Sequence, residues 1–177
     1  MSIFKFLGLQ QPDPTEQTGD TETVRRIVDE LEAMDPAKAR YVAAFAYILG
    51  RVANADLDIS KSETHKMETI VQQLGHLSED QTVLAVQIAK SQHRLLGGTE
   101  NFLVTREFVA ISTAKQRIEL LDCLFAVSAA DDSISSVEES QIRQIASELG
   151  FSHRQFVEAR TAYSEHREVL KPFQQDS

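Results

Sequence analysis

One short acidic stretch occurs twice in this sequence, and the duplication limits the folds that the chain can adopt. Residues 52–75 and 127–150 are identical at nine of 24 aligned positions, where ordinary composition would give roughly one or two. The shared pattern is Ala-Asp-x-x-Ile-Ser-x-x-Glu, which begins at Ala55 in the first copy and at Ala130 in the second. Each copy follows a very apolar segment and precedes an amphipathic one. The chain is therefore predicted to contain two related helix–acidic turn–helix units.

The spacing of apolar residues predicts helices along most of the chain. Residues 36–54 and 114–130 are apolar almost all round, which is typical of central, buried helices. No segment alternates between apolar and polar residues over a useful length, so strands are not expected. Helices are expected over about 21–34, 36–54, 60–75, 78–96, 100–112, 114–130, 135–150 and 152–170. We therefore predict an all-α fold, a seven- to eight-helix bundle with an internal pseudo-twofold repeat, in which the two apolar helices cross at the centre.

Helix starts and ends have their own sequence signals. A Ser or Thr followed three residues later by Glu or Gln predicts a capping box at a helix N-terminus. Asp35-Pro36 predicts another helix start, with Asp as the N-cap. Gly75 and Gly150 are expected to end helices in the left-handed conformation. The predicted capping boxes are Ser60/Glu63, Ser78/Gln81, Thr113/Gln116, Ser135/Glu138 and Ser152/Gln155.

Charge and composition exclude some classes of function. The chain has 177 residues, with 27 acidic against 18 basic residues and a formal net charge of −9. Phosphate backbones would repel such a chain, so nucleic acid is not expected as a partner. Cys123 is the only cysteine, which fits a buried thiol in a reducing cytoplasm, and we predict a cytoplasmic location. No segment has the roughly 20 apolar residues that span a bilayer. The apolar residues 1–9 are expected to pack on the bundle or fray, with peripheral membrane contact as the alternative.

The acidic turns resemble the second half of a calcium-binding EF-hand loop. If Glu63 is the last ligand, Asp56 falls at the fifth loop position, but the first position is then Val52, inside an apolar helix. A complete calcium loop is thereby excluded. Grouped carboxylates repel one another unless a cation or basic partner neutralises them, and hard, oxygen-preferring cations suit such a group. The candidate ions are Ca²⁺, Mg²⁺, Mn²⁺ and Zn²⁺. The candidate metal ligands are Asp56, Asp58, Glu63, Asp131, Asp132 and Glu138.

Helix capping is the competing interpretation of the same residues. Ser-x-x-Glu satisfies the first free N–H groups of a helix without any ligand, and Asp near that end favours the helix dipole. Capping leaves additional charge unexplained, namely Asp56 with Asp58 in the first copy and Asp131, Asp132 and Glu139 in the second. Metal binding and simple capping therefore both remain open at this point.

In each half of the chain, an apolar helix is followed by the Ala-Asp-x-x-Ile-Ser-x-x-Glu pattern, by a further helix and by Leu-Gly. This order of features resembles the TerB-like family of tellurite-resistance proteins. The resemblance covers roughly residues 36–165 and appears in both halves. It implies an all-helical fold whose acidic turns hold divalent metal or dock partners, with Asp56, Glu63, Asp131 and Glu138 at the matching positions. The family often has Gly directly after the Asp, where this chain has Leu57 and Asp132. A related domain occurs in membrane co-chaperones, but this chain has no His-Pro-Asp motif, so co-chaperone activity is not carried over.

These observations predict the domain organisation and two functions. Residues 1–19 are an apolar segment with a polar linker, 20–171 form a single TerB-like domain with repeat halves at about 36–98 and 113–170, and 172–177 are a tail. One hypothesis is a metal-binding module in tellurite, metal or stress response. The other is a metal-independent helical module that recruits a protein partner. An enzyme is not expected, because no motif for nucleophilic, zinc or di-iron chemistry is present.

Overall fold

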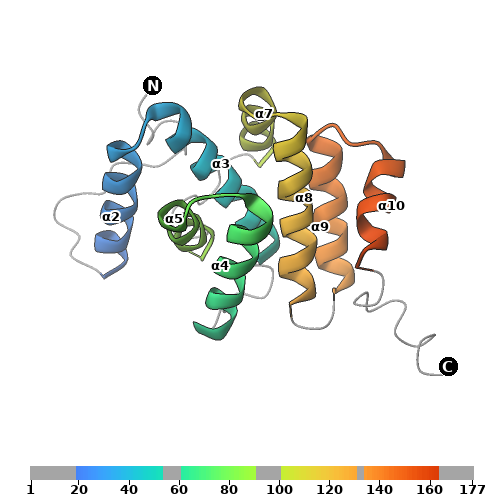
Figure 1. The fold of residues 1–177 in the computed structure, drawn as a ribbon, viewed down its shortest axis with the longest axis horizontal. Helices are drawn as coiled ribbons and strands as arrows, with labels where there is room; N and C mark the ends of the chain where they lie inside the picture. The colour runs from blue at the N-terminus through green and yellow to red at the C-terminus, as the bar shows by residue number, and fades with distance from the viewer. Residues whose placement is uncertain (1–18, 54–60, 91–100, 131–133, 164–177) are drawn as a thin grey trace.

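The computed structural model describes residues 19–53, 61–90, 101–130 and 134–163 (Figure 1). These residues form helices and no strands, which confirms the predicted all-α class. The pseudo-twofold relation between the halves stays a prediction. The eight helices of the described ranges are α2 (Gly19–Ala33), α3 (Pro36–Ala53), α4 (Lys61–Gly75), α5 (Glu79–Lys90), α7 (Asn101–Ile111), α8 (Ala114–Ala129), α9 (Ser136–Glu148) and α10 (His153–Thr161).

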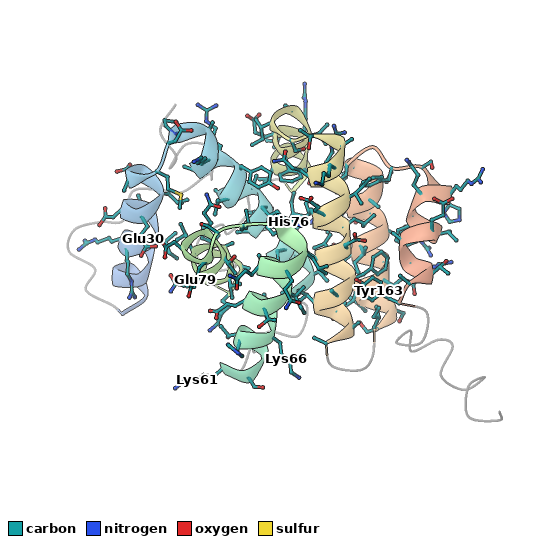
Figure 2. The ribbon with its side chains drawn as sticks, viewed as in Figure 1. Glu30, Lys61, Lys66, His76, Glu79 and Tyr163 are labelled. Atoms are coloured by element: carbon teal, nitrogen blue, oxygen red, sulfur yellow. The ribbon has the colours of Figure 1, made fainter. Side chains whose placement is uncertain are left out.

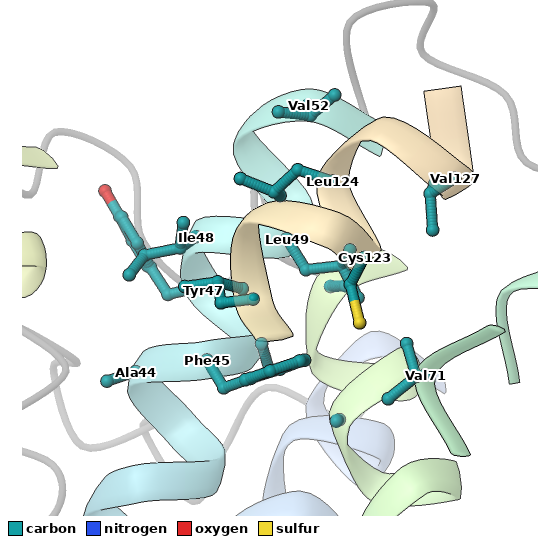
Figure 3. Packing of buried hydrophobic residues seen from close by; sticks show 14 of the residues in the cluster. Ala44, Phe45, Tyr47, Ile48, Leu49, Val52, Val71, Cys123, Leu124 and Val127 are labelled. Atoms are coloured by element: carbon teal, nitrogen blue, oxygen red, sulfur yellow. The ribbon is translucent and has the colours of Figure 1, made fainter. Parts of the chain in front are cut away.

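Helix α3 runs through the middle of the molecule, as its apolar sequence predicted. Every residue from Val42 to Gly50 is buried, and α3 packs against α5, α7 and α8 (Figure 1). Figure 3 shows Phe45 and Leu49 of α3 facing Cys123 and Leu124 of α8. Both predicted apolar helices therefore meet in one core, and the other helices cover them.

Four of the predicted capping boxes are present. In the box of α9, the Ser135 N–H donates to Glu138 Oε2 at 2.8 Å, and the Glu138 N–H donates to Ser135 Oγ at 3.1 Å. Equivalent reciprocal bonds open α5, α8 and α10. Asp35 caps α3 more loosely, with its Oδ2 3.4 Å from the Lys38 amide. Ser60, the cap predicted for α4, lies outside the described residues.

The two helix-ending glycines have different roles, which corrects part of the prediction. Gly150 has a φ of 90° and closes α9 in a Schellman motif, with the Phe151 N–H bonded to the Ala146 carbonyl at 2.9 Å. Gly75 is the last residue of α4, but the positive φ, 53°, belongs to His76. A Cβ on residue 75 would lie 3.1 Å from Phe45 Cζ. Close packing against the Phe45 ring, and not backbone conformation, is therefore what calls for glycine at position 75.

Some predicted boundaries also change. The last helix was expected to continue to about residue 170, but α10 ends at Thr161 and a turn follows over residues 162–163. Only Phe156 of α10 is fully buried, and residues 164–170 lie outside the described part of the chain. Helix α2 begins at Gly19, inside the segment predicted as linker. The expected extension of α5 beyond Lys90 lies outside the described residues.

Candidate functional site

Most of the predicted metal ligands lie outside the described part of the chain. Asp56 and Asp58 belong to the first acidic turn and Asp131 and Asp132 to the second, and none of these four is described. Glu63 lies in the first turn of α4, but its side chain is not described. Glu138 is thus the one candidate ligand whose side chain can be placed.

Glu138 caps α9, as the competing interpretation predicted. Its carboxylate accepts the Ser135 N–H at 2.8 Å, and it lies half-buried in the first turn of the helix. This position also suits a negative charge, because the free N–H groups give the helix N-terminus a partial positive charge. The cap accounts for Ser135 and Glu138 without a cation.

Glu139 carries part of the additional charge that capping left unexplained, and the structure supplies basic partners for it. Arg160 Nη1 of α10 lies 2.9 Å from Glu139 Oε1, and Arg143 Nη2 lies 3.7 Å from the same oxygen. Both guanidinium groups also lie 5.5 Å from the centre of the Phe156 ring. Glu139 is therefore part of the contact between α9 and α10.

The sequence analysis missed a second, more deeply buried network at the ends of α3 and α9. Arg51 Nη1 lies 2.7 Å from Glu148 Oε2, and their side chains are only 4% and 12% exposed. Thr105 Oγ1 of α7 donates to the same carboxylate oxygen at 2.8 Å. Burial opposes ionisation of Glu148, but hydrogen bonds from Arg51 and Thr105 and the charge of Arg51 outweigh it, so the pKa of Glu148 is lowered.

A signal for this network was available in the sequence. Arg51 is the only charged residue between Tyr41 and Ala53, in a helix that is otherwise apolar. A buried charge needs a partner, so one buried carboxylate elsewhere in the chain could have been expected. Sequence spacing gave no means of selecting Glu148, which is 97 residues away.

Titratable groups also gather on the exposed side of α8. Glu119 Oε1 lies 3.2 Å from His76 Nδ1, at the end of α4, and 3.9 Å from Lys115 Nζ. Figure 2 shows His76 and Tyr163 on opposite sides of α8. The Tyr163 hydroxyl donates to the Asp122 carbonyl at 3.4 Å. Burial, and secondly the charge of Glu119, raises the pKa of Asp122.

The prediction that the Cys123 thiol is buried is confirmed. Cys123 is fully buried, and burial with smaller contributions from Asp122 and Glu119 raises its pKa to about 12, so the thiol stays protonated and unreactive. His65 is 84% exposed, and its Nδ1 lies 4.0 Å from Glu68 Oε2.

The described side chains do not form a metal centre by themselves. Among the side chains that the structure describes, which exclude those of residues 19–24 and Glu63, no three His, Cys, Asp or Glu side chains are grouped so as to hold an ion. The helices of residues 19–53, 61–90, 101–130 and 134–163 are also too short or too polar to cross a membrane.

Comparison with known proteins gives one match. A family model described as tellurite resistance protein TerB matches residues 41–161. The matched region begins within α3 and ends with α10, so it contains both copies of the acidic turn, and α2 lies outside it. No curated protein and no solved structure matches the chain significantly.

Proposed function

The chain belongs to the TerB family of tellurite resistance proteins, and we propose that it is a non-enzymatic module that binds a divalent cation through its two acidic turns. Ca²⁺, Mg²⁺, Mn²⁺ and Zn²⁺ are the candidate ions. The module acts in the cytoplasmic response to tellurite, metal or other stress. Its ligands are Asp56, Asp58 and Glu63 in one turn and Asp131, Asp132 and Glu138 in the other.

The observation that carries this proposal is the position of the family match. The matched residues 41–161 include both acidic turns, and each turn places three carboxylates within nine residues or fewer. Hard divalent cations prefer such oxygen ligands. A cation at the second turn can share Glu138 with the Ser135 capping bond, since a carboxylate accepts more than one partner.

A second candidate function is a metal-independent protein-interaction module, and the carboxylates beside the second turn favour it. Glu138 caps α9, and Glu139 is paired with Arg160. Both charges thus have structural roles that need no cation. On this hypothesis the acidic turns start helices, and the module acts by presenting a helical surface to another protein.

Calorimetric titration separates the two functions. Each of the four cations is titrated into chelator-treated wild type and into the Glu63→Gln/Glu138→Gln double variant. Gln keeps the acceptor oxygen of each cap and removes only the charge. Glu30→Gln/Glu79→Gln is the matched control, because both residues are exposed and lie outside the turns.

Saturable binding in wild type and in the control, with at least a tenfold loss of affinity in the turn variant, supports the cation site. Absence of saturable heat with every ion in wild type overturns it and leaves the interaction module. Binding that is equal in all three proteins places the ion elsewhere on the chain.

A further inference from the structure

One side of helix α8 is left uncovered by the other helices of the described residues. α8 lies between α4 and α9, and it also packs on α3 and α10 (Figure 1). From Leu120 to Ala129 every residue is buried except Asp122 and Ala126, which are half-buried. Ile118, one turn before Asp122, is 50% exposed. Because positions 118, 122 and 126 are four residues apart, their side chains form one row along the uncovered side of the helix.

The carboxylate in this row, that of Asp122, lacks a basic partner. His76 Nδ1 and Lys115 Nζ both approach Glu119 Oε1 instead, at 3.2 and 3.9 Å. In the described part of the chain, the Asp122 carboxylate takes part in no ion pair and no hydrogen bond. Burial and the charge of Glu119 raise the pKa of Asp122, and no basic group lowers it. The fold therefore keeps a half-buried negative charge that it does not stabilise.

Such a charge indicates a cationic ligand. A positive group beside Asp122 would favour its ionised form and offset the effect of burial. Titratable groups held in unfavourable surroundings are typical of functional sites. A metal ion is a poor fit, because no third His, Cys, Asp or Glu among the described side chains joins Asp122 and Glu119 in a ligand group. A Lys or Arg side chain, by contrast, can pair with a single carboxylate.

The neighbours of Asp122 indicate that this cation is attached to an apolar group. Ile118 exposes half of its side chain, at a spacing that places its Cβ about 5–6 Å from that of Asp122. Tyr163 also borders Asp122, because its hydroxyl donates to the Asp122 carbonyl at 3.4 Å. The Tyr163 ring stacks on Phe125 at 5.5 Å between centroids and is thereby held in place. An aromatic ring held in this way beside an exposed aliphatic side chain is typical of protein–protein interfaces.

We propose that Ile118, Asp122 and Tyr163 form a docking surface for a basic segment of a partner protein, in which a Lys or Arg pairs with Asp122 and an adjacent apolar side chain covers Ile118. Nucleic acids and anionic membranes do not fit this surface, because Asp122 and Glu119 would repel their phosphates. Cation binding by the acidic turns is not required for this contact.

Peptide display on the full-length protein tests the surface. A library of random peptides is selected on wild type, and the affinity of each recovered peptide is measured for wild type, Ile118→Ser/Asp122→Asn and Val137→Ser/Glu158→Gln. The last variant is the matched control, because it also removes one apolar side chain and one carboxylate, at positions that are 63% and 66% exposed. None of the four substituted side chains is fully buried, so both variants are expected to fold.

The proposal predicts peptides that carry a Lys or Arg beside an apolar residue. They should bind wild type and the control variant equally, and Ile118→Ser/Asp122→Asn at least tenfold more weakly. Peptides without a basic residue, equal binding to all three proteins, or a selection that recovers no binding peptide would each overturn the proposal.

A change in the peptide tests the ion pair itself. Replacement of the peptide's Lys or Arg by Gln should weaken binding to wild type at least tenfold, but should have little effect on binding to Asp122→Asn, where the partner charge is absent. An equal loss with both proteins would show that Asp122 does not pair with the basic residue, and would overturn the proposal.

The chain's own basic residues beyond Tyr163 are the competing occupant of this surface. Arg167 and Lys171 follow Tyr163 by four and eight residues. The recovered peptides are therefore also titrated into full-length Arg167→Gln/Lys171→Gln. Affinity equal to that of wild type supports a partner protein as the occupant. Affinity at least tenfold tighter would show that the chain's own C-terminal residues occupy the surface, and would overturn the proposal.

Discussion

Arg51 and Glu148 lie 97 residues apart in the sequence, yet Arg51 Nη1 is 2.7 Å from Glu148 Oε2 and both side chains are almost completely buried. Thr105 donates to the same oxygen, so one carboxylate joins α3, α7 and α9. The pair is not a surface salt bridge, because water has little access to either group. Its role is to join the C-terminal ends of α3 and α9 to the middle of α7 in one arrangement around the core.

Removal of one partner of this pair should be strongly destabilising. Glu148→Ala leaves Arg51 buried without its counter-ion, and we expect a loss of about 3–5 kcal/mol in the free energy of unfolding, measured with urea. Glu158→Ala is the matched control, because Glu158 is 66% exposed and pairs with exposed Arg154, and it should cost no more than about 0.5 kcal/mol. An Arg51→Met/Glu148→Leu double variant should lie closer to wild type than Glu148→Ala, since it removes both buried charges. Equal stability of Glu148→Ala and Glu158→Ala would contradict this account.

The same pair should make stability depend on pH in a defined direction. Because Arg51 and Thr105 lower the pKa of Glu148 in the folded state, its contribution is fully present above its unfolded pKa and is lost as the pH falls through the lower folded value. The difference in unfolding free energy between wild type and Glu148→Gln should therefore shrink as the pH is lowered from about 7 to about 3. Other carboxylates titrate in both proteins, so the difference isolates Glu148. A difference that is constant over this range would show that ionisation of Glu148 is not what stabilises the fold.

The sequence was sufficient for the helices and for most of their ends, because these depend on local signals. The absence of a polar face identified α3 as central, and Ser-x-x-Glu or its equivalents located the starts of α5, α8, α9 and α10. Pairings between distant residues have no such local signal. This is why the Arg160 partner of Glu139 and the Glu148 partner of Arg51 were not predicted.

The candidate site could be predicted only as a set of alternatives. The atoms of Ser135 and Glu138 that form a helix cap are the same atoms that would serve in the second half of a cation-binding loop. One sequence pattern therefore predicts both the cap and the cation site. The structure shows the cap, and the carboxylates that would complete a cation site, Asp131 and Asp132, lie outside its described residues. Gly75 and Gly150 also show that one sequence pattern can have two structural causes. The same Leu-Gly motif allows close packing against Phe45 at residue 75 and a positive φ at residue 150.

Neutralisation of Asp122 should stabilise the protein at neutral pH. Burial and the charge of Glu119 raise the pKa of Asp122, so the ionised form is disfavoured in the folded state. Because the pKa of Asp122 is higher in the folded state than in the unfolded state, ionisation of Asp122 destabilises the fold. This destabilisation is absent below the unfolded-state pKa and grows as the pH rises through the folded-state pKa. Asp122→Asn should therefore increase the free energy of unfolding at about pH 7 by less than about 1 kcal/mol, because the group is partly solvated, and should have no effect at about pH 3. A loss of stability at neutral pH would instead indicate that the Asp122 charge has a favourable partner.

The two repeated glycines offer a test of whether equivalent sequence positions have equivalent physical roles. Gly75→Ala would place a Cβ 3.1 Å from Phe45 Cζ in the core, and we expect a loss of about 1–3 kcal/mol from overpacking. Gly150→Ala meets no atom within 4 Å but forces alanine into a φ of 90°, which costs about 1–2 kcal/mol through the backbone. Phe45→Leu separates these two causes in a double-mutant cycle, because leucine lacks the Cζ atom that a Cβ at residue 75 would approach. The cost of Gly75→Ala should fall by more than about 0.5 kcal/mol in the Phe45→Leu background, whereas the cost of Gly150→Ala should simply add. If both glycine substitutions add to Phe45→Leu, the close approach of α4 to the Phe45 ring does not determine the choice of glycine at residue 75.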